Sequence, residues 1–87
     1  MISKTRPAFW RAYDPLASSV KARAREVYRL FEQNPDHPSL RFKKLQGRED
    51  VWSVRINEQY RAVEVRSGDT IEWIWIGTQN EFDKLFT

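Results

Sequence analysis

The 87-residue chain has no cysteine and only one histidine, His37. Without cysteine there is no disulfide and no thiolate ligand for a metal, so the composition suits the reducing cytoplasm. One histidine cannot form the histidine pair of a metal site. Its place between two prolines predicts a capping or exposed loop residue. We therefore expect neither a metal nor another cofactor.

Long apolar runs are also missing from the chain. No stretch approaches the ~18 apolar residues of a membrane span, and the first residues lack the apolar segment of a signal peptide. No internal repeat, low-complexity tract or linker divides the sequence. Residues 1–87 therefore predict one small domain, whose thin core depends on large aromatic side chains.

The charge is only mildly positive. A formal net charge of +3 permits nucleic-acid binding without requiring it. The distribution is more informative, because residues 41–48 carry cations and no anion. This run is a candidate nucleic-acid site, although basic runs are often only solvated surface. Its cations are Arg41, Lys43, Lys44 and Arg48, and a second basic cluster lies within 21–29.

Helical patterns fill the first third of the chain. A short strand is expected at 2–6, followed by a helix that begins at Pro7 and ends before Pro15. Ser18 or Ser19 is expected to cap the next helix, which ends at Asn34. One apolar stripe defines that helix through Val20, Ala24, Val27 and Phe31.

The rest of the chain is β-rich. Residues 39–45 are expected to be extended, with Phe42 and Leu45 in the core, and β-rich runs follow at 52–56, 60–65 and 71–76. Alternation puts Arg55 on the face opposite Val54, and puts Trp73 and Trp75 together on one face. Residues 79–86 predict a final helical segment.

These elements predict an α+β domain of order β-α-α-β-β-β-β-α. Two N-terminal helices pack on one face of a small antiparallel sheet, and a short C-terminal helix closes the chain. The other sheet face stays partly open. Arg55 and Arg61 are expected there, where a ligand would bind.

The order and spacing of several short strings resemble the RelE/ParE superfamily, the toxin half of bacterial type II toxin–antitoxin pairs. The similarity covers nearly the whole chain and rests on the succession of strings, because no single string is specific. The strings are Tyr28-Arg29-Leu30-Phe31, Asn34-Pro35, Arg41-Phe42-Lys43-Lys44-Leu45, Trp52-Ser53-Val54-Arg55-Ile56, Tyr60-Arg61-Ala62, Trp75-Ile76-Gly77 and Glu81-Phe82-Asp83-Lys84-Leu85.

The resemblance implies the α+β fold described above and a small antitoxin partner. RelE-like members cut mRNA, usually in the ribosomal A site, whereas ParE-like members poison DNA gyrase. Cutting needs no metal, because the 2′-hydroxyl of the RNA attacks the neighbouring phosphate. The protein supplies a base, cations for the developing charge and an acid for the leaving oxygen.

The resemblance also implies roles for single residues. Arg61 matches the arginine that holds the scissile phosphate, and Arg55 matches a basic position on the preceding strand. Ser53 stands where some members have a second lysine. Gln79 stands where members carry Arg or His, and Phe82 stands where many carry Tyr. Neither Gln79 nor Phe82 can transfer a proton.

Sequence physics leaves other roles open for the two arginines. Arg61 is equally suited to pair across strands with Glu72 or Glu64, and Glu64 is the obvious structural partner of Arg55. The functional alternatives are a ribosome-associated mRNA endoribonuclease, with Arg55, Arg61 and Gln79 in its site, and a non-enzymatic binding module. That module would inhibit gyrase or only bind its antitoxin. A small basic RNA-binding domain with an aromatic sheet is a third possibility.

Overall fold

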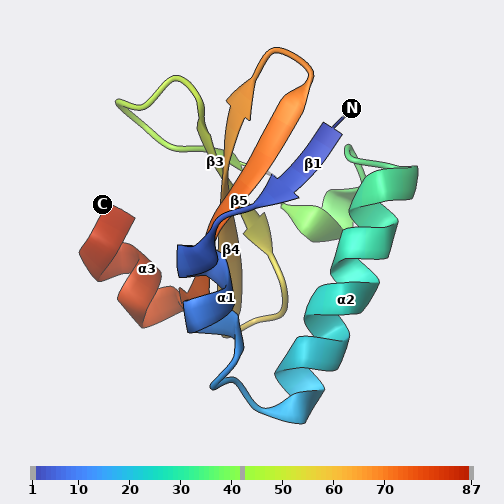
Figure 1. The fold of residues 1–87 in the computed structure, drawn as a ribbon, viewed down its shortest axis with the longest axis vertical. Coiled ribbons are helices and arrows are strands. Elements are labelled where there is room, and N and C mark those ends of the chain that lie inside the picture. The colour runs from blue at the N-terminus through green and yellow to red at the C-terminus, as the bar shows by residue number, and fades with distance from the viewer. Residues whose placement is uncertain (1, 42, 87) are drawn as a thin grey trace.

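The computed structural model describes residues 2–41 and 43–86. The expected core role of Phe42 lies outside these residues. The element order agrees with the predicted one, with a short 3₁₀ helix added (Figure 1). The elements are β1 (Ile2–Thr5), α1 (Pro7–Tyr13), α2 (Ser18–Gln33), η1 (Pro38–Leu40), β2 (Lys43–Lys44), β3 (Val51–Arg55), β4 (Tyr60–Ser67), β5 (Thr70–Thr78) and α3 (Gln79–Phe86).

The sheet is mixed, not purely antiparallel as expected. Its strand order is β1-β5-β4-β3-β2, and β1 runs parallel to β5 while the other pairs are antiparallel. The antiparallel part is a meander joined by short turns. No turn joins β1 to β5, because most of the chain lies between them, so no hairpin imposes an antiparallel arrangement.

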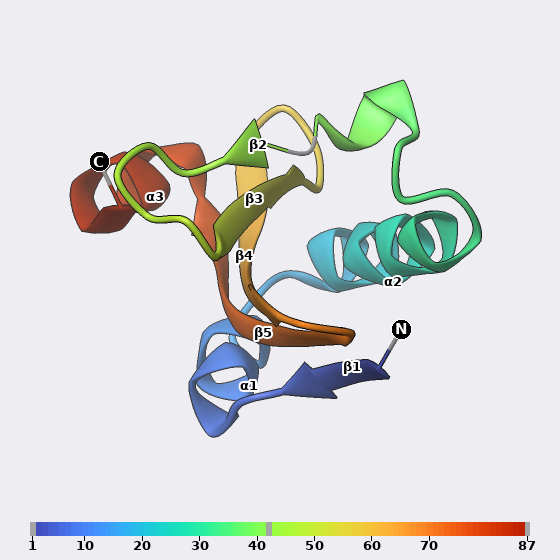
Figure 2. The same cartoon turned by 90° about the horizontal axis from the view of Figure 1, so that it is seen from above.

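Two apolar clusters lie on opposite faces of the sheet. Figure 2 views the sheet nearly along its strands, with α2 on one side and α3 on the other. The α2-side cluster contains Phe9, Val27, Phe31, Leu40, Val54, Ile56, Ala62, Ile71, Trp73 and Ile76. The α3-side cluster contains Leu45, Val51, Val63 and Phe82, with Trp75 and Phe86 packed against it.

A β-bulge in β5 divides its aromatic side chains between the two faces. Val63 pairs with Trp75 and Glu64 pairs with Trp73, so Ile74 is the extra residue on β5. An extra residue reverses the alternation of side chains beyond it. Trp73 therefore lies in the α2-side cluster and Trp75 against the α3-side cluster. The expectation that both tryptophans share a face is wrong.

Helix starts differ in how they are capped. Pro7 occupies the first turn of α1 as expected. The predicted serine cap of α2 is wrong, because Ala17 is the N-cap residue and no side chain bonds the first turn. Without that cap, α2 depends on burying its apolar stripe, in which Val27 and Phe31 are the most deeply buried residues.

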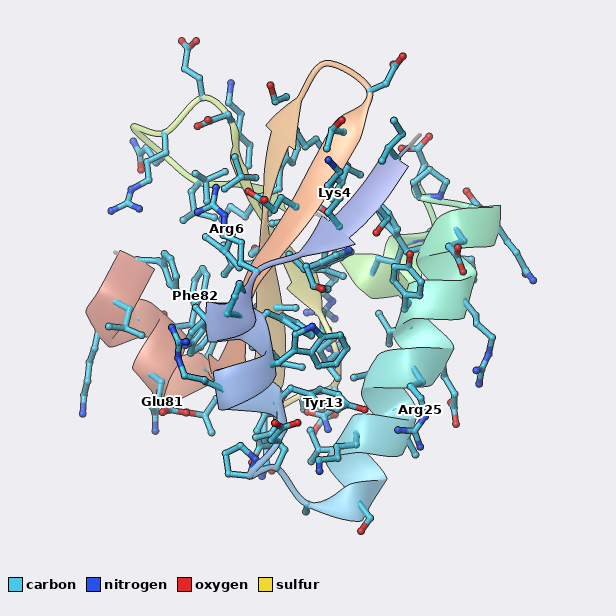
Figure 3. The ribbon with its side chains drawn as sticks, in the orientation of Figure 1. Lys4, Arg6, Tyr13, Arg25, Glu81 and Phe82 are labelled. Carbon is cyan, nitrogen blue, oxygen red and sulfur yellow. The ribbon has the colours of Figure 1, made fainter. Side chains whose placement is uncertain are left out.

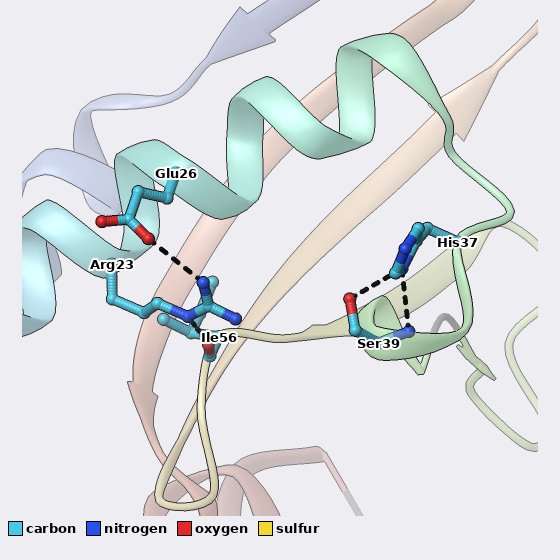
Figure 4. Close-up of polar contacts among 5 residues, drawn as sticks. All are labelled: Arg23, Glu26, His37, Ser39 and Ile56. Carbon is cyan, nitrogen blue, oxygen red and sulfur yellow. Dashed lines mark hydrogen bonds and ion pairs between the residues drawn. The ribbon is translucent and has the colours of Figure 1, made fainter.

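Polar contacts involve the first half of α2 and the segment that follows the helix (Figure 4). Arg23 donates to the backbone oxygen of Ile56 at 3.1 Å and pairs with Glu26 at 3.2 Å. Beyond the helix, the Nδ1 atom of His37 accepts from the Ser39 backbone amide at 3.1 Å, which confirms a capping histidine. The 39–45 segment is not continuously extended, because η1 occupies its start.

Glu64 is a carboxylate buried within β4. It is 0% exposed and pairs with Arg66 at 2.9 Å, while its Oε2 atom has no hydrogen-bond partner among the described residues. The guanidinium of Arg66 also lies 4.8 Å from the centre of the Trp52 ring. Burial raises the pKa of Glu64, and Arg66 opposes this through its hydrogen bond and its charge. Desolvation therefore outweighs the ion pair.

We expect Glu64 to make stability fall as pH rises. Its pKa in the folded protein lies above the ordinary value near 4.5. Between the ordinary pKa and the raised pKa, the folded state holds the Glu64 proton more tightly than the unfolded state does. The stability that this proton gives the folded state is therefore lost as pH rises from the lower value through the higher one. Glu64→Gln removes the ionisable group and with it this pH-dependent contribution to stability. The free energy of unfolding of the variant should therefore rise relative to that of the parent as pH rises through that window.

Urea unfolding at several pH values between about 4 and 8 measures the difference in the free energy of unfolding between Glu64→Gln and the parent. The exposed Glu32→Gln serves as the matched control, and its stability should follow that of the parent. Curves for Glu64→Gln that stay parallel to the parent across this range would contradict the assignment.

Candidate functional site

A basic cleft opens on the α3 side of the sheet. It has a volume of about 720 Å³, and its walls come from β2, the β2–β3 loop, one residue each of β3 and β4, and α3. Figure 2 shows that loop beside α3, and the Arg48 guanidinium lies 5.9 Å from the centre of the Phe86 ring. The structure brings five of the predicted site residues together along its walls. They are Lys43, Lys44, Arg48, Arg61 and Gln79.

Arg61 sits at the point where β4 meets α3. Its Nε atom donates to Oε1 of Gln79, and Nε2 of Gln79 donates to Asp83 at 3.0 Å. The two charged neighbours thus orient the Gln79 amide. Burial lowers the pKa of Arg61, Arg55 and Arg41 lower it further, and Asp83 raises it. Arg61 is therefore a partly desolvated cation in a positive field.

Arg55 lies directly across from Arg61 in the β3–β4 register. The proposed acidic partners bind elsewhere, because Glu64 pairs with Arg66 and Glu72 pairs with Arg6. Like charges placed opposite each other destabilise a sheet. The cross-strand alternative is therefore wrong for both arginines, and an added anion would relieve their repulsion.

The remaining predicted positions have different environments. Ser53 is buried in the cleft wall and donates to the backbone oxygen of Lys43 at 3.4 Å. Phe82 is buried in the α3-side cluster, and Figure 3 shows its ring directed from α3 toward the sheet. Arg41 does not line the cleft, unlike Lys43, Lys44 and Arg48. The charge of Arg41 nevertheless acts on Arg61, because it lowers the pKa of that residue.

The start of α3 fixes Gln79 in place. Thr78 donates to Glu81 through its backbone amide at 3.0 Å and its hydroxyl at 2.9 Å, and the Glu81 amide donates back at 3.2 Å. These bonds with Thr78 lower the pKa of Glu81. The Gln79 amide donates to the Gln59 backbone at 2.7 Å. Sequence analysis missed this capping box, which the Thr-x-x-Glu spacing indicates.

A second concavity, here called the apolar groove, lies on the other face. Its volume is about 500 Å³, and both N-terminal helices line it together with β1, β4 and β5. At one end, Arg25 of α2 donates to the Tyr13 hydroxyl of α1 at 2.9 Å (Figure 3). Trp10 lines the groove and remains 45% exposed. Sequence analysis did not find this groove, because residues distant in sequence form it.

The comparison with known domain families covers α2 to α3. The family model described as "ParE-like toxin domain" matches residues 18–84. The chain therefore belongs to the ParE-like toxin domain family. No curated protein sequence matches the chain.

Solved structures show the same fold at low sequence identity. A YoeB/ParE toxin from Agrobacterium tumefaciens is 20% identical with a TM-score of 0.71, covering 91% of this chain and 99% of its own. RelE in the RelB–RelE antitoxin–toxin complex from Methanococcus jannaschii is 17% identical, with a TM-score of 0.73 and coverages of 97% and 99%. The matching chain of the DinJ–YafQ toxin–antitoxin complex of E. coli is 11% identical, with a TM-score of 0.76. The match covers 98% of this chain and 96% of that one.

Gly77 determines how closely Trp75 approaches the base of α3. A Cβ atom at Gly77 would overlap the Trp75 indole, with Cη2 at 2.7 Å, and would lie 3.1 Å from Oε1 of Glu81. Gly77→Ala should therefore displace the indole or the capping carboxylate. We expect a loss of about 1–3 kcal/mol in the free energy of unfolding.

Urea denaturation of Gly77→Ala checks this expectation. Thr70→Ala, a half-buried position at the other end of β5, serves as the control for losses caused by β propensity alone. Equal and small losses in both variants would show that the contact with Trp75 does not constrain α3.

Proposed function

We propose that this protein is the toxin of a type II toxin–antitoxin pair and cuts ribosome-associated mRNA in the cytoplasm without a metal. The observation that carries the proposal is the position of Arg61. It is a partly desolvated cation in the wall of a basic cleft, faces Arg55 across the strand pair, and has no carboxylate opposite it. Such a cation is suited to the negative charge that develops on a phosphate under attack.

The other cations extend this surface along a strand of RNA. Lys43 and Lys44 of β2 and Arg48 of the β2–β3 loop lie in the cleft wall. A nucleic-acid backbone carries one charge per nucleotide, so several cations in one cleft suit it better than a single small anion. Cations in this geometry would hold the phosphates on either side of the scissile bond.

Proton transfer needs a group that Gln79 cannot supply. Asp83 is the one carboxylate among the described residues lining the cleft, and it contacts Gln79 directly. In the proposed reaction Asp83 accepts the proton of the 2′-hydroxyl as that oxygen attacks the adjacent phosphorus. The bond to the 5′-oxygen then breaks and leaves a 2′,3′-cyclic phosphate. Arg61 stabilises the pentavalent phosphate, and water protonates the leaving oxygen.

Arg61→Ala tests the proposal. Removing one preorganised cation typically costs ~10²–10³ in rate, so growth arrest on induction and cleavage seen by primer extension should both be lost. Arg11→Ala, an exposed arginine on α1 that lines neither concavity, is the matched control and should leave both unchanged. Asp83→Asn keeps an oxygen for Gln79 and should reduce cleavage while leaving RNA binding at least as tight.

A non-enzymatic binder is the second candidate. It is favoured by Gln79 and Phe82, since neither carries a proton-transferring group. A gyrase inhibitor would leave mRNA uncut in every variant and would inhibit DNA supercoiling by purified gyrase. Growth arrest that survives Arg61→Ala without any RNA cleavage would overturn the nuclease proposal in favour of this one.

The apolar groove supports an antitoxin partner. Aromatic side chains of Phe9, Tyr28 and Trp73 line its floor, and Lys4 and Arg25 contribute positive charge at its rim. An amphipathic segment with apolar residues on one face and acidic residues on the other complements such a surface. Among the structural relatives, RelE and YafQ are recorded as complexes with antitoxins.

We expect a tight complex with an acidic partner of fewer than about a hundred residues, with a dissociation constant at or below nanomolar. Co-purification of the tagged chain with the products of neighbouring genes should recover it. Ala24→Trp, which places an indole in the groove, should weaken binding about tenfold or more. Ala8→Trp, exposed on α1 outside the groove, should not. Recovery of a lone, non-toxic monomer would contradict the expectation.

A further inference from the structure

The walls of the basic cleft differ in chemistry. Its cations come from β2, the β2–β3 loop and β4, whereas the second half of α3 contributes apolar side chains, Phe82, Leu85 and Phe86. Leu85 is 58% exposed there. A phosphate backbone accounts for the cations, but it has no apolar group to place against α3. A ligand that fills the whole cleft therefore carries apolar surface as well as negative charge.

Phe86 is fixed from behind and borders the cleft. The centre of its ring lies 5.4 Å from that of Trp75 and 5.5 Å from that of Phe82. Both neighbours belong to the α3-side cluster, and Phe86 itself is half-buried and lines the cleft. Its orientation is therefore set by packing, while part of its ring remains available to a ligand.

Arg48 lies opposite Phe86 on the β2–β3 loop, which Figure 2 shows beside α3. Its backbone amide donates to the Leu45 oxygen at 3.2 Å, so the loop is held at this point and the long, exposed side chain is the part that can move. None of the ion pairs among the described residues engages its guanidinium.

The spacing of the pair suits a planar group between them. The guanidinium of Arg48 lies 5.9 Å from the centre of the Phe86 ring. Carbon atoms in contact are ~3.5–4 Å apart, so a flat ring stacked on both partners needs ~7–8 Å. A shift of the Arg48 side chain by roughly 1–2 Å therefore admits one ring. Guanidinium planes and aromatic rings are the two groups on which proteins stack nucleobases.

We propose that Arg48 and Phe86 form a stacking site that holds one nucleobase of the bound strand, with a preference for a purine. The inference rests on the proposed function for the identity of the ligand, because RNA supplies both the phosphates and the base. Purines are preferred because their larger ring system covers more of both partners.

The stacking site is separated from Arg61 by the length of α3. Gln79, which contacts Arg61, begins this helix and Phe86 ends it. Seven residues at 1.5 Å each make about 10 Å. A strand advances ~3.4 Å per stacked nucleotide, so the base lies roughly one to three nucleotides from the phosphate at Arg61. The site therefore selects sequence beside the scissile bond.

Two variants remove stacking while keeping the other properties of each side chain. Arg48→Lys retains the charge without the plane, and Phe86→Leu retains apolar packing against Trp75. Each is titrated with a short strand of 2′-O-methyladenosine, which cannot be cut because the attacking hydroxyl is blocked, and with an abasic strand of equal length and charge. The parent should bind the adenine strand about tenfold more tightly than the abasic one.

Both variants should lose most of this difference and bind the abasic strand as the parent does. Phe86→Tyr, which restores an aromatic ring, should recover it, and a uridine strand should bind the parent more weakly than the adenine strand. Lys84→Ala, an exposed change on α3 outside the cleft walls, serves as the control and should behave as the parent.

Equal affinity of the parent for the adenine and abasic strands would overturn the proposal. So would losses in Arg48→Lys and Phe86→Leu that are the same for both strands, because the two residues would then act on the backbone alone. The outcome is separable from that of the proposed function. Base-dependent binding by a parent that leaves RNA uncut would support the stacking site and reject the nuclease. Cleavage by a parent whose binding is insensitive to bases would do the reverse.

Discussion

The bulge at Ile74 is the constraint on which the rest of the structure depends. Strict alternation along β5 would place Trp73 and Trp75 on one face and leave the other face without a tryptophan from this strand. The extra residue instead gives each face one tryptophan, and each of these anchors an apolar cluster. A chain of 87 residues buries little surface, so sharing its large side chains between two faces holds both α2 and α3 on one sheet.

The same bulge also sets the position of the site. The bulge places Trp75 on the α3 side, and Gly77, two residues further on, lies on the same side under the Trp75 indole. The strand then ends at Thr78, whose capping bonds with Glu81 start α3 at once. Gln79 is consequently brought onto Arg61 of β4. Bulges often re-aim side chains next to functional sites, and here one extra residue connects core packing to the cleft wall.

Much of the fold follows from local patterns in the sequence, because those patterns report local forces. The apolar stripe of α2, the meander and the outward direction of Arg55 were all predictable in this way. The parallel pairing of β1 and the bulge in β5 were not, because they depend on contacts between distant segments. For the site, the resemblance indicated Arg61 and Gln79, but only the coordinates separate Arg41 from the lysines that follow it and bring Asp83 into the cleft.

The two concavities lie on opposite faces of the sheet, which limits how a partner can silence the cleft. A segment that fills only the apolar groove leaves the basic cleft open, because β4 and β5 stand between them. The longest dimension of the molecule is 32 Å. An extended chain covers about 3.3 Å per residue, so roughly ten further residues would reach from one face to the other. Acidic residues in that extension would be suited to the cations of the cleft wall, Lys43, Lys44, Arg48 and Arg61. A partner built this way would block the cleft through charge as well as through space.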